Sequence, residues 1–190
     1  MPRTVAANKI IKDERKQSLL YAALPLFALY GEKVSVDMIC EKAKCSHGLL
    51  YHYFRDANNV LFNIKKLDQY NDLKNRVINI NDNGSPIDSI YQILNNVNSV
   101  LSKGKSEELS ILVLLLQDED KDSVFSYLVS LVREGQKVNQ VTAGKPEDIC
   151  KVYINQNIGV LLKKLLQKYS KIEILPVDNL IQIFIKKTVR

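Results

Sequence analysis

The stretch Ala43-Lys44-Cys45-Ser46-His47-Gly48-Leu49-Leu50-Tyr51-His52-Tyr53-Phe54 decides the fold of this chain. Its first part predicts a sharp turn, because Lys44-Cys45-Ser46 leaves no room for a longer connection between two helical patterns. Ser46 predicts the N-cap of a short helix that ends before the break at Arg55-Asp56. Leu50 and Phe54 are four positions apart, so they lie together on the inward face of that helix.

A longer helical pattern precedes this turn. Apolar residues with helical spacing run from Leu19 to Phe27 and predict a helix that begins near Asp13-Glu14. Gly31 predicts its C-terminal cap, and Ser35 predicts the N-cap of the next helix, which ends near Ala43. Two helices, a sharp turn and a third short helix therefore follow one another.

Helical spacing continues to the end of the chain, and no segment shows sustained alternation of apolar and polar residues. Gly, Pro and Asn clusters, above all Asn81–Pro86, separate the segments. The sequence predicts an all-α fold of about nine helices. They are expected near residues 13–31, 35–43, 46–54, 56–79, 87–101, 109–116, 124–138, 147–169 and 177–189. Ile111–Leu116 is apolar on every side and is expected at the centre of a core.

Positive charge is concentrated in the first third of the chain. Residues 1–66 hold 11 Lys and Arg against 6 Asp and Glu, a net charge of +5, whereas residues 67–190 carry +1. A basic segment around a groove-sized helix is the electrostatic pattern of a nucleic-acid-binding domain. On charge alone, a solvated basic face is the alternative. The first dozen residues are expected to form a loose basic arm.

The short helix offers few charges but suitable groups for a DNA groove. Ser46 and His47, at its start, can donate to phosphates or base edges. Gly48 lets the backbone approach closely, and Leu49 can pack on a thymine methyl group. Lys44 in the turn is expected to contact a phosphate, and Lys42 and the basic arm can add further contacts of this kind.

The aromatic residues of this helix have two interpretations. Tyr51 and His52 can donate to phosphates or base edges, and Tyr53 lies at the flank of the same face. The alternative is that Tyr51 and Tyr53 are core aromatics. For Phe54 we adopt the core interpretation.

Over residues 15–62 the chain resembles transcription regulators of the TetR family. Ala22-Ala23, Phe27, Gly31, Ser35, Ile39, Ala43 and the Ser-x-Gly-x-Leu-Tyr-x-x-Phe stretch that begins at Ser46 recur there in this order and spacing. The resemblance places groove-facing positions along the turn and the short helix. With Lys44 and Arg55 added as phosphate contacts, the candidate DNA-binding residues are Ser35, Lys44, Ser46, His47, Gly48, Leu49, Tyr51, His52, Tyr53 and Arg55.

Three positions depart from the family pattern. The family usually has Gly at the position of Lys44, a small or polar residue at that of Leu49, and a phosphate-binding Lys at that of Ala57. The chain therefore lacks one phosphate contact, for which Arg55 can substitute. These departures also leave open an alternative, a TetR-like fold that binds another protein in place of DNA.

The last two expected helices carry apolar residues on two sides. Ile154, Ile158, Leu161, Leu162, Leu165 and Tyr169 form one stripe, and Gly159 would let a second helix approach closely. Two such helices from each of two subunits would form a four-helix interface with two-fold symmetry. The candidate homodimer residues are Ile154, Ile158, Gly159, Leu162, Leu180, Ile181 and Phe184. An ordinary monomer core is the alternative.

The resemblance implies a division of labour along the chain. Residues 1–55 are expected to form a three-helix DNA-binding domain with the basic arm, and residues 56–190 a helical ligand-binding and dimerisation domain. A repressor would leave a palindromic operator when a small-molecule effector changes the spacing of its recognition helices. Polar residues that could line the effector cavity are Tyr91, Gln117, Tyr127, Asn155 and Gln156, and the effector is expected to be apolar.

Other classes of protein find little support in the sequence. The chain has no Gly-rich phosphate loop, and its only histidines, His47 and His52, have a poor spacing for shared metal ligation. We therefore expect neither an enzyme nor a cofactor or metal site. Cys40, Cys45 and Cys150 form no C-x-x-C pair and are interpreted as small buried hydrophobes, with a redox switch as the alternative. No membrane span or signal peptide is apparent, so a cytoplasmic protein is expected.

Overall fold

The structure, a computed structural model, describes residues 5–80, 84–166 and 172–186. These residues form ten α-helices and two short 3-10 helices, and their only β pairing is an isolated bridge between Val141 and Ile185. The predicted all-α class is confirmed, with a helix count close to the expected nine. The chain divides into two compact units, Met1–Asn71 and Asp72–Arg190, which we call unit 1 and unit 2.

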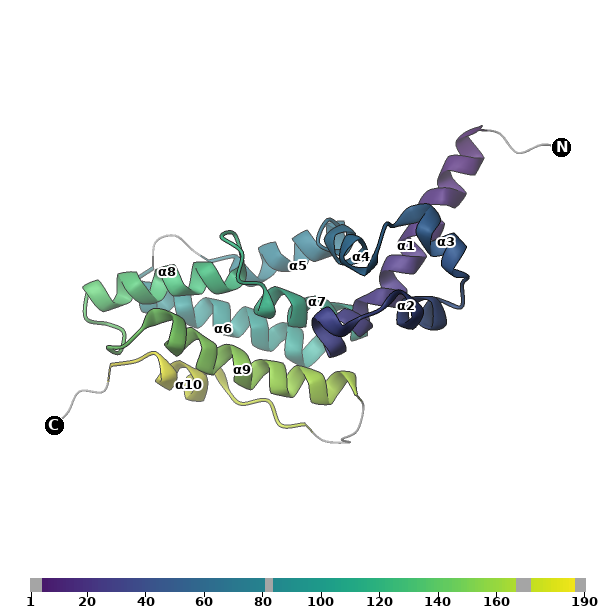
Figure 1. Cartoon of the computed structure of the whole chain (residues 1–190). Helices are drawn as coiled ribbons and strands as arrows, with labels where there is room; N and C mark the ends of the chain where they lie inside the picture. Colours follow the sequence, from purple (N-terminus) through teal and green to yellow (C-terminus); the bar gives the residue numbers. More distant parts are fainter. Residues whose placement is uncertain (1–4, 81–83, 167–171, 187–190) are drawn as a thin grey trace. The chain divides into compact units, whose positions relative to one another are not determined.

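Unit 1 contains the predicted helix-turn-helix (Figure 1). Its elements are α1 (Val5–Tyr30), η1 (Gly31–Lys33), α2 (Val36–Ala43), α3 (His47–Tyr53), α4 (Ala57–Ile64) and the start of α5 (Asp68–Ile78). Helix α1 contacts both α2 and α4. The side chains that fill this small core are Leu19, Leu24, Phe27, Ile39, Leu50, Phe54, Val60 and Ile64, each at most 1% exposed.

The predicted helix boundaries in unit 1 are confirmed where a cap specifies them. Gly31 has φ +55°, the left-handed conformation that ends α1 and that glycine adopts without a steric cost. The Ser35 Oγ accepts from the Met38 amide at 3.2 Å, and the Asp56 carboxylate accepts from the Asn59 amide at 2.7 Å. Both are N-caps that satisfy otherwise free amides at the helix start.

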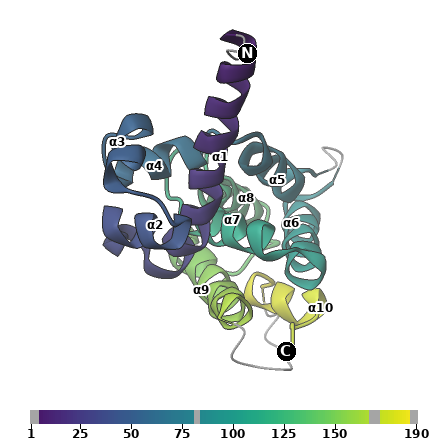
Figure 2. The same cartoon turned by 90° about the vertical axis from the view of Figure 1, so that its right-hand side faces the viewer.

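The start of α1 differs from the prediction. The expected loose arm is helical from Val5, and Arg3 lies outside the described residues. Residues 8–15 are exposed, so this part of the helix rests on the intrinsic helix propensity of its Lys, Glu and Arg residues rather than on packing. Figure 2 shows it projecting beyond α2, α3 and α4.

The single helix expected over 56–79 is two helices. After Ile64 the chain tightens into bonds between residues three apart, from the Lys66 amide to the Asn63 carbonyl and from Leu67 to Ile64. Asp68 then places a carboxylate in the first turn of α5, where it interacts favourably with the helix dipole. The even apolar spacing of the sequence does not reveal this break.

Unit 2 is built from longer helices, of which α6, α8 and α9 run roughly side by side in Figure 1. After the rest of α5 come α6 (Pro86–Lys103), α7 (Ser106–Gln117), α8 (Val124–Lys137), α9 (Pro146–Leu165), α10 (Val177–Leu180) and η2 (Ile181–Ile183). Helix α7 packs against α6, α8 and α9. Its residues Ile111–Leu116 are all buried, as their uniformly apolar pattern predicts.

The long helix expected over 177–189 does not form within the described residues. The chain makes the single turn of α10 and then η2, because its next residues pair with a distant segment: the Thr142 amide donates to the Phe184 carbonyl at 2.8 Å. Phe184 is fully buried beside the Tyr153 ring, with 5.9 Å between the ring centroids. Residues 81–83, Tyr169 and the last four residues lie outside the described residues.

Candidate nucleic-acid interface

The turn between α2 and α3 is closed by Lys44 in the left-handed conformation, with φ 51° and ψ 51°. The Lys44 amide donates to the Glu41 carbonyl at 3.2 Å, and the Cys45 amide donates to the Cys40 carbonyl at 3.0 Å. This bond pair is the Schellman motif, which satisfies the free carbonyls at a helix end. Glycine adopts the left-handed conformation more easily than lysine does, so a glycine in place of Lys44 would fit the same turn.

Helix α3 is oriented by its cap and by two inward side chains. The Ser46 Oγ accepts from the Leu49 amide at 3.2 Å, which confirms Ser46 as the N-cap. Leu50 and Phe54 are buried, as predicted, and fix the inner face of α3 in unit 1. The helix is too short to be stable alone, so its direction depends on these contacts.

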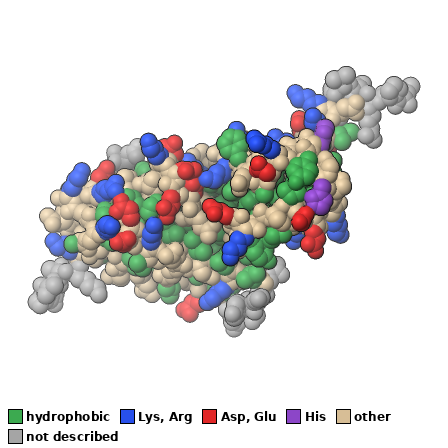
Figure 3. Space-filling view, in the orientation of Figure 1, with side chains coloured by type: hydrophobic (Ala, Val, Ile, Leu, Met, Phe, Trp, Pro, Cys, Tyr) green, Lys and Arg blue, Asp and Glu red, His purple; other side chains and the backbone are tan. Residues whose placement is uncertain are grey.

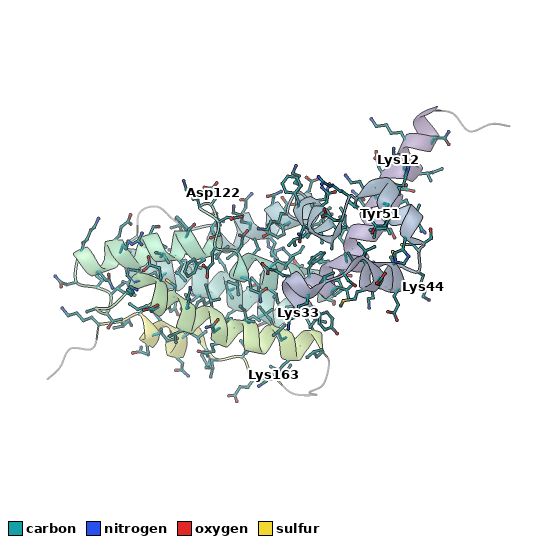
Figure 4. The ribbon with its side chains drawn as sticks, viewed as in Figure 1. Lys12, Lys33, Lys44, Tyr51, Asp122 and Lys163 are labelled. Carbon is teal, nitrogen blue, oxygen red and sulfur yellow. The ribbon has the colours of Figure 1, made fainter. Side chains whose placement is uncertain are left out.

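The outer face of α3 is open. Gly48 and His52 are exposed, Tyr51 is 56% exposed, and Leu49 and Tyr53 are half-buried. For Tyr51 the core interpretation is therefore wrong. A methyl group added to Gly48 would meet no atom closer than 4.0 Å, so the backbone here is free to approach a partner. Figure 4 shows Tyr51 and Lys44 on the surface of unit 1.

One contact in this surface, between His47 and Asp37, was not predicted from the residue pattern. The His47 Nε2 lies 2.5 Å from the Asp37 Oδ1, and both side chains are largely exposed. This contact joins the first turn of α2 to the first turn of α3. It also places a carboxylate among the candidate contacts, where it would repel a phosphate. Figure 3 shows the two histidines, in purple, on the surface.

The remaining candidates lie at the two ends of the helix pair. Ser35 and Arg55 are exposed, Ser35 as the cap of α2 and Arg55 just after Phe54, the C-cap of α3. The Tyr53 ring contacts the His52 ring edge to face, with 4.9 Å between centroids, so Tyr53 also supports a neighbouring candidate. Unit 1 thus brings all ten predicted residues onto the α2 start, the turn and α3, and onto the residue that follows.

The helical start of α1 supplies positive charge close to this surface. Lys9, Lys12 and Arg15 are exposed, and the Lys16 ammonium lies 5.7 Å from the centre of the Phe54 ring at the end of α3. Lys9, Lys12 and Lys16 follow the helical spacing that places them on one side of α1. The predicted basic arm is therefore helical from Val5, and its Lys9 and Lys12 continue on the side of α1 that carries Lys16.

In unit 2 the candidate dimer residues divide into two groups. Ile154, Leu180, Ile181 and Phe184 are at most 6% exposed, because the chain's own core covers them. Ile158 and Leu162 are half-buried and Gly159 is exposed, with nothing within 4 Å of an added methyl group. The accessible part of the predicted interface is therefore one face of α9, which also carries the 57% exposed Val152.

A shallow depression of about 370 Å³ lies between α7, α8 and α9. Two polar candidates, Gln117 and Asn155, line it. A Lys151–Glu119 ion pair, with 3.2 Å between Nζ and Oε1, also lies on it. The other lining residues are apolar: Leu116, Phe125, Ile154 and Ile158.

The other polar candidates for an effector cavity lie elsewhere. Tyr127 lines a second depression with α5 residues such as Ile78. The Tyr91 hydroxyl donates to Asp178 at 2.8 Å, which ties α6 to α10 and raises the pKa of Tyr91. Gln156 is half-buried on α9 and lines neither depression. The structure therefore brings together two of the five.

In the described parts of the chain, no group of three or more His, Cys, Asp or Glu side chains could hold a metal ion. Across the same residues, no helix has the length and apolar character that a membrane crossing requires.

Comparison with known proteins gives a consistent picture. Residues 19–61 match the model of bacterial regulatory proteins of the tetR family. A TetR-family transcriptional regulator from Vibrio parahaemolyticus aligns with a TM-score of 0.59 at 16% identity, over 91% of this chain and 99% of its own. No protein of curated function matches the chain.

Two further solved structures share the fold. HlyIIR, a hemolysin II transcriptional regulator, aligns with a TM-score of 0.62 at 18% identity, over 93% of this chain and 99% of its own. SmeT, solved as a complex with triclosan, aligns with a TM-score of 0.50 at 16% identity, over 91% and 92% of the two chains. At these identities the similarity establishes the fold that the two units form.

Proposed function

We propose that this chain, whose residues 19–61 match the tetR family model, is a repressor that binds a DNA operator through α3 and is released by a small-molecule effector. The observation that carries the proposal is the outer face of α3, where a Ser46-capped helix presents Gly48, Tyr51 and His52 to solvent. A helix of this size fits the major groove of B-DNA.

Within the groove, each exposed group has a chemical role. The Gly48 backbone approaches the bases, Leu49 packs on a thymine methyl group, and Tyr51 and His52 donate to base edges or phosphates. Ser46 and His47 sit at the helix start, where amide and side-chain donors favour anions. His47 can turn from Asp37 to a phosphate when DNA arrives, because both partners are exposed.

Phosphate contacts then supply most of the affinity. Lys44 at the turn and Arg55 after α3 flank the recognition helix and are both exposed. Ala57 stands at the position where the family has a phosphate-binding lysine, and Arg55 would make that contact in its place. Ser35 caps α2 and leaves its hydroxyl at the surface. Because each phosphate contact releases a counterion, the affinity should fall steeply with salt.

We assign DNA binding to residues 1–55 and effector binding and dimerisation to residues 56–190. A two-fold dimer would place two recognition helices about 34–36 Å apart, in successive major grooves of a palindromic site. The open face of α9 around Ile158, Gly159 and Leu162 supports this assignment, since a partner helix could approach at Gly159. The four buried candidates would support α9 through the core of unit 2: Ile154, Leu180, Ile181 and Phe184.

The effector site proposed for unit 2 is the depression between α7, α8 and α9. Its apolar residues and its two amides, Gln117 and Asn155, fit an apolar molecule with one or two hydrogen-bonding groups. Binding there would act on α9, which also carries the proposed dimer face. A change in α9 would then alter the spacing of the two recognition helices.

The test is a fluorescence-anisotropy titration of a labelled duplex from the region upstream of the gene, at two salt concentrations, with a scrambled duplex as competitor. The proposal expects tight, salt-sensitive binding that the scrambled duplex does not displace. Binding equal to that of scrambled duplexes across the whole upstream region would contradict it. Nothing in the described residues favours the alternative of a protein-interaction module.

Tyr51→Ala tests the assigned face within the same assay. Because Tyr51 is 56% exposed, its loss should weaken operator binding by roughly tenfold, or 1–3 kcal/mol, without changing the unfolding temperature. Phe62→Ala is the matched control, since Phe62 is 55% exposed on α4, outside the proposed face. Equal effects of the two substitutions would remove Tyr51 from the contact face.

A further inference from the structure

The turn of the helix-turn-helix holds two cysteines close together. Cys40 lies in the last turn of α2 and Cys45 is the second residue of the turn, joined by the backbone bond of 3.0 Å from the Cys45 amide to the Cys40 carbonyl. The Schellman motif brings these two positions together, and side chains at these positions frequently make contact.

The two thiols differ in access to solvent. Cys40 is 5% exposed, whereas Cys45 is half-buried. Both line a shallow surface depression, so a small reagent can reach the pair through Cys45. The charged and titratable groups around the depression are Asp37, Glu41, Lys44 and His47.

We propose that Cys40 and Cys45 form a reversible disulfide when a peroxide oxidises the protein, and that this bond lowers its affinity for DNA. The second half rests on the proposed function, whereas the first half does not. This role differs from that of Cys150, which is buried in α9 of unit 2.

The reaction proceeds in two steps. The Cys45 sulfur, as a thiolate, attacks one oxygen of hydrogen peroxide, an S–O bond forms, the O–O bond breaks, and the hydroxide that leaves takes up the proton from Cys45 to become water. The Cys40 sulfur then attacks the Cys45 sulfur, which forms the S–S bond and expels the oxygen as a second water with the Cys40 proton. Two thiols and one peroxide thus give one disulfide and two waters.

The order of attack follows from the surroundings of each thiol. Burial, the Cys45 thiol and the Asp37 carboxylate raise the pKa of Cys40 to about 11, so Cys40 stays protonated and is a poor first nucleophile. Cys45 is half-buried and lines the surface depression, so a small reagent reaches its sulfur more easily than that of Cys40. Cys45 therefore reacts first and Cys40 resolves the intermediate.

The disulfide would reshape the turn that holds α3. Forming an S–S bond of about 2.05 Å draws the Cys45 side chain toward α2. Lys44 and Ser46 are its immediate neighbours, and Ser46 caps α3 with a bond of 3.2 Å to the Leu49 amide. Moving them shifts one phosphate contact and the start of the recognition helix. We expect a loss of DNA affinity of at least roughly tenfold.

Peptide mapping tests the disulfide without any DNA. Trypsin cleaves after Lys42 and Lys44, so Cys40 and Cys45 fall on different peptides that only a disulfide can hold together. The folded, reduced protein is treated with a small excess of hydrogen peroxide, its remaining thiols are alkylated, and the digest is analysed by mass spectrometry. A linked pair of these peptides, lost after dithiothreitol, is the expected result.

Matched variants make this result specific. Cys150→Ala should form the linked pair as the wild type does, whereas Cys45→Ala should not. Unlinked peptides in the oxidised wild type would overturn the proposal, and so would Cys45 found only in disulfides between two chains. Circular dichroism on each variant confirms that it is folded.

The operator duplex then tests the regulatory half. Oxidised wild type should bind more weakly than reduced wild type and recover with dithiothreitol, whereas Cys45→Ala should bind equally with or without peroxide. A linked pair with unchanged affinity would overturn the regulatory half. If the reduced protein binds no operator, the proposed function fails, while the peptide map still decides on the disulfide.

Discussion

The turn and α3 in unit 1 and helix α7 in unit 2 are stabilised in opposite ways. Helix α3 is exposed on its outer face and is held by the Ser46 cap and by Leu50 and Phe54 beneath it. Helix α7 is surrounded, with every residue from Leu109 to Leu116 buried. Local hydrogen bonds specify the first, and burial of apolar surface specifies the second.

This contrast predicts that substitutions in the two units have different effects. In unit 1, changes in cap and turn residues should alter the position of α3 more than the total stability. In unit 2, changes in buried side chains should alter the free energy of unfolding and leave the recognition surface intact. Four substitutions test this separation, in order of decreasing effect.

Leu112→Ala should have the largest effect. Leu112 is fully buried at the centre of α7, so truncation should lower the free energy of unfolding by about 2–5 kcal/mol. Urea denaturation followed by circular dichroism measures the change. Gln117→Ala, at the exposed end of the same helix, is the control. A loss below 1 kcal/mol for Leu112→Ala would mean that α7 is less tightly packed than its burial indicates.

Tyr153→Phe should have the next largest effect, with the opposite sign. The Tyr153 hydroxyl is fully buried and has no hydrogen-bond partner among the described residues, and burial raises its pKa. Removing an unpaired buried hydroxyl should raise the free energy of unfolding by about 1–3 kcal/mol. The same denaturation series measures it, with Tyr91→Phe, which breaks a bond to Asp178, as the control. Destabilisation would reveal a partner for the hydroxyl.

Ser46→Ala should cost about 1 kcal/mol, because the amide of Leu49 loses its acceptor. Its effect on operator affinity should be larger than its effect on stability suggests, since the start of α3 is freed. Ser123→Ala is the matched control: Ser123 caps α8 through the Ser126 amide at 3.0 Å, in the other unit. Equal operator affinity of the two variants would break the comparison.

Lys44→Gly should have the smallest effect, a rise in the free energy of unfolding of about 0.5–1 kcal/mol. Glycine removes the strain of the left-handed conformation at this position, and the greater flexibility of the unfolded chain offsets part of that gain. Operator affinity should fall, and the slope of affinity against salt should decrease by about one phosphate contact. Lys42→Gly is the contrasting control, since Lys42 lies inside α2 and glycine should destabilise it. An unchanged salt slope for Lys44→Gly would exclude Lys44 as a phosphate contact.

The features that the sequence predicted correctly are local ones. Gly31, Ser35, Ser46 and Asp56 act within three or four residues of their own position, so their residue type is enough to place a helix boundary. The uniformly apolar run in α7 likewise identified its own burial. The positions of the candidate DNA contacts follow from the same short-range signals.

The features that were missed depend on distant residues. The end of the chain leaves the helix because Phe184 and Ile185 meet residues 141–142, a pairing that no local pattern encodes. The His47–Asp37 contact appears only once α2 and α3 are folded against each other. The break between α4 and α5, after Ile64, was missed because the helical spacing of apolar residues continues across it.

The burial of Leu109–Leu116 in α7 also has a consequence during synthesis on the ribosome. Helix α7 contacts α8 and α9, which follow it in the chain, so Ile111–Leu116 has no full cover until α9 has emerged. At bacterial elongation rates of roughly 5–20 residues per second this interval lasts several seconds. A nascent chain that exposes six consecutive aliphatic residues for that time is a ready substrate for chaperones and prone to aggregate.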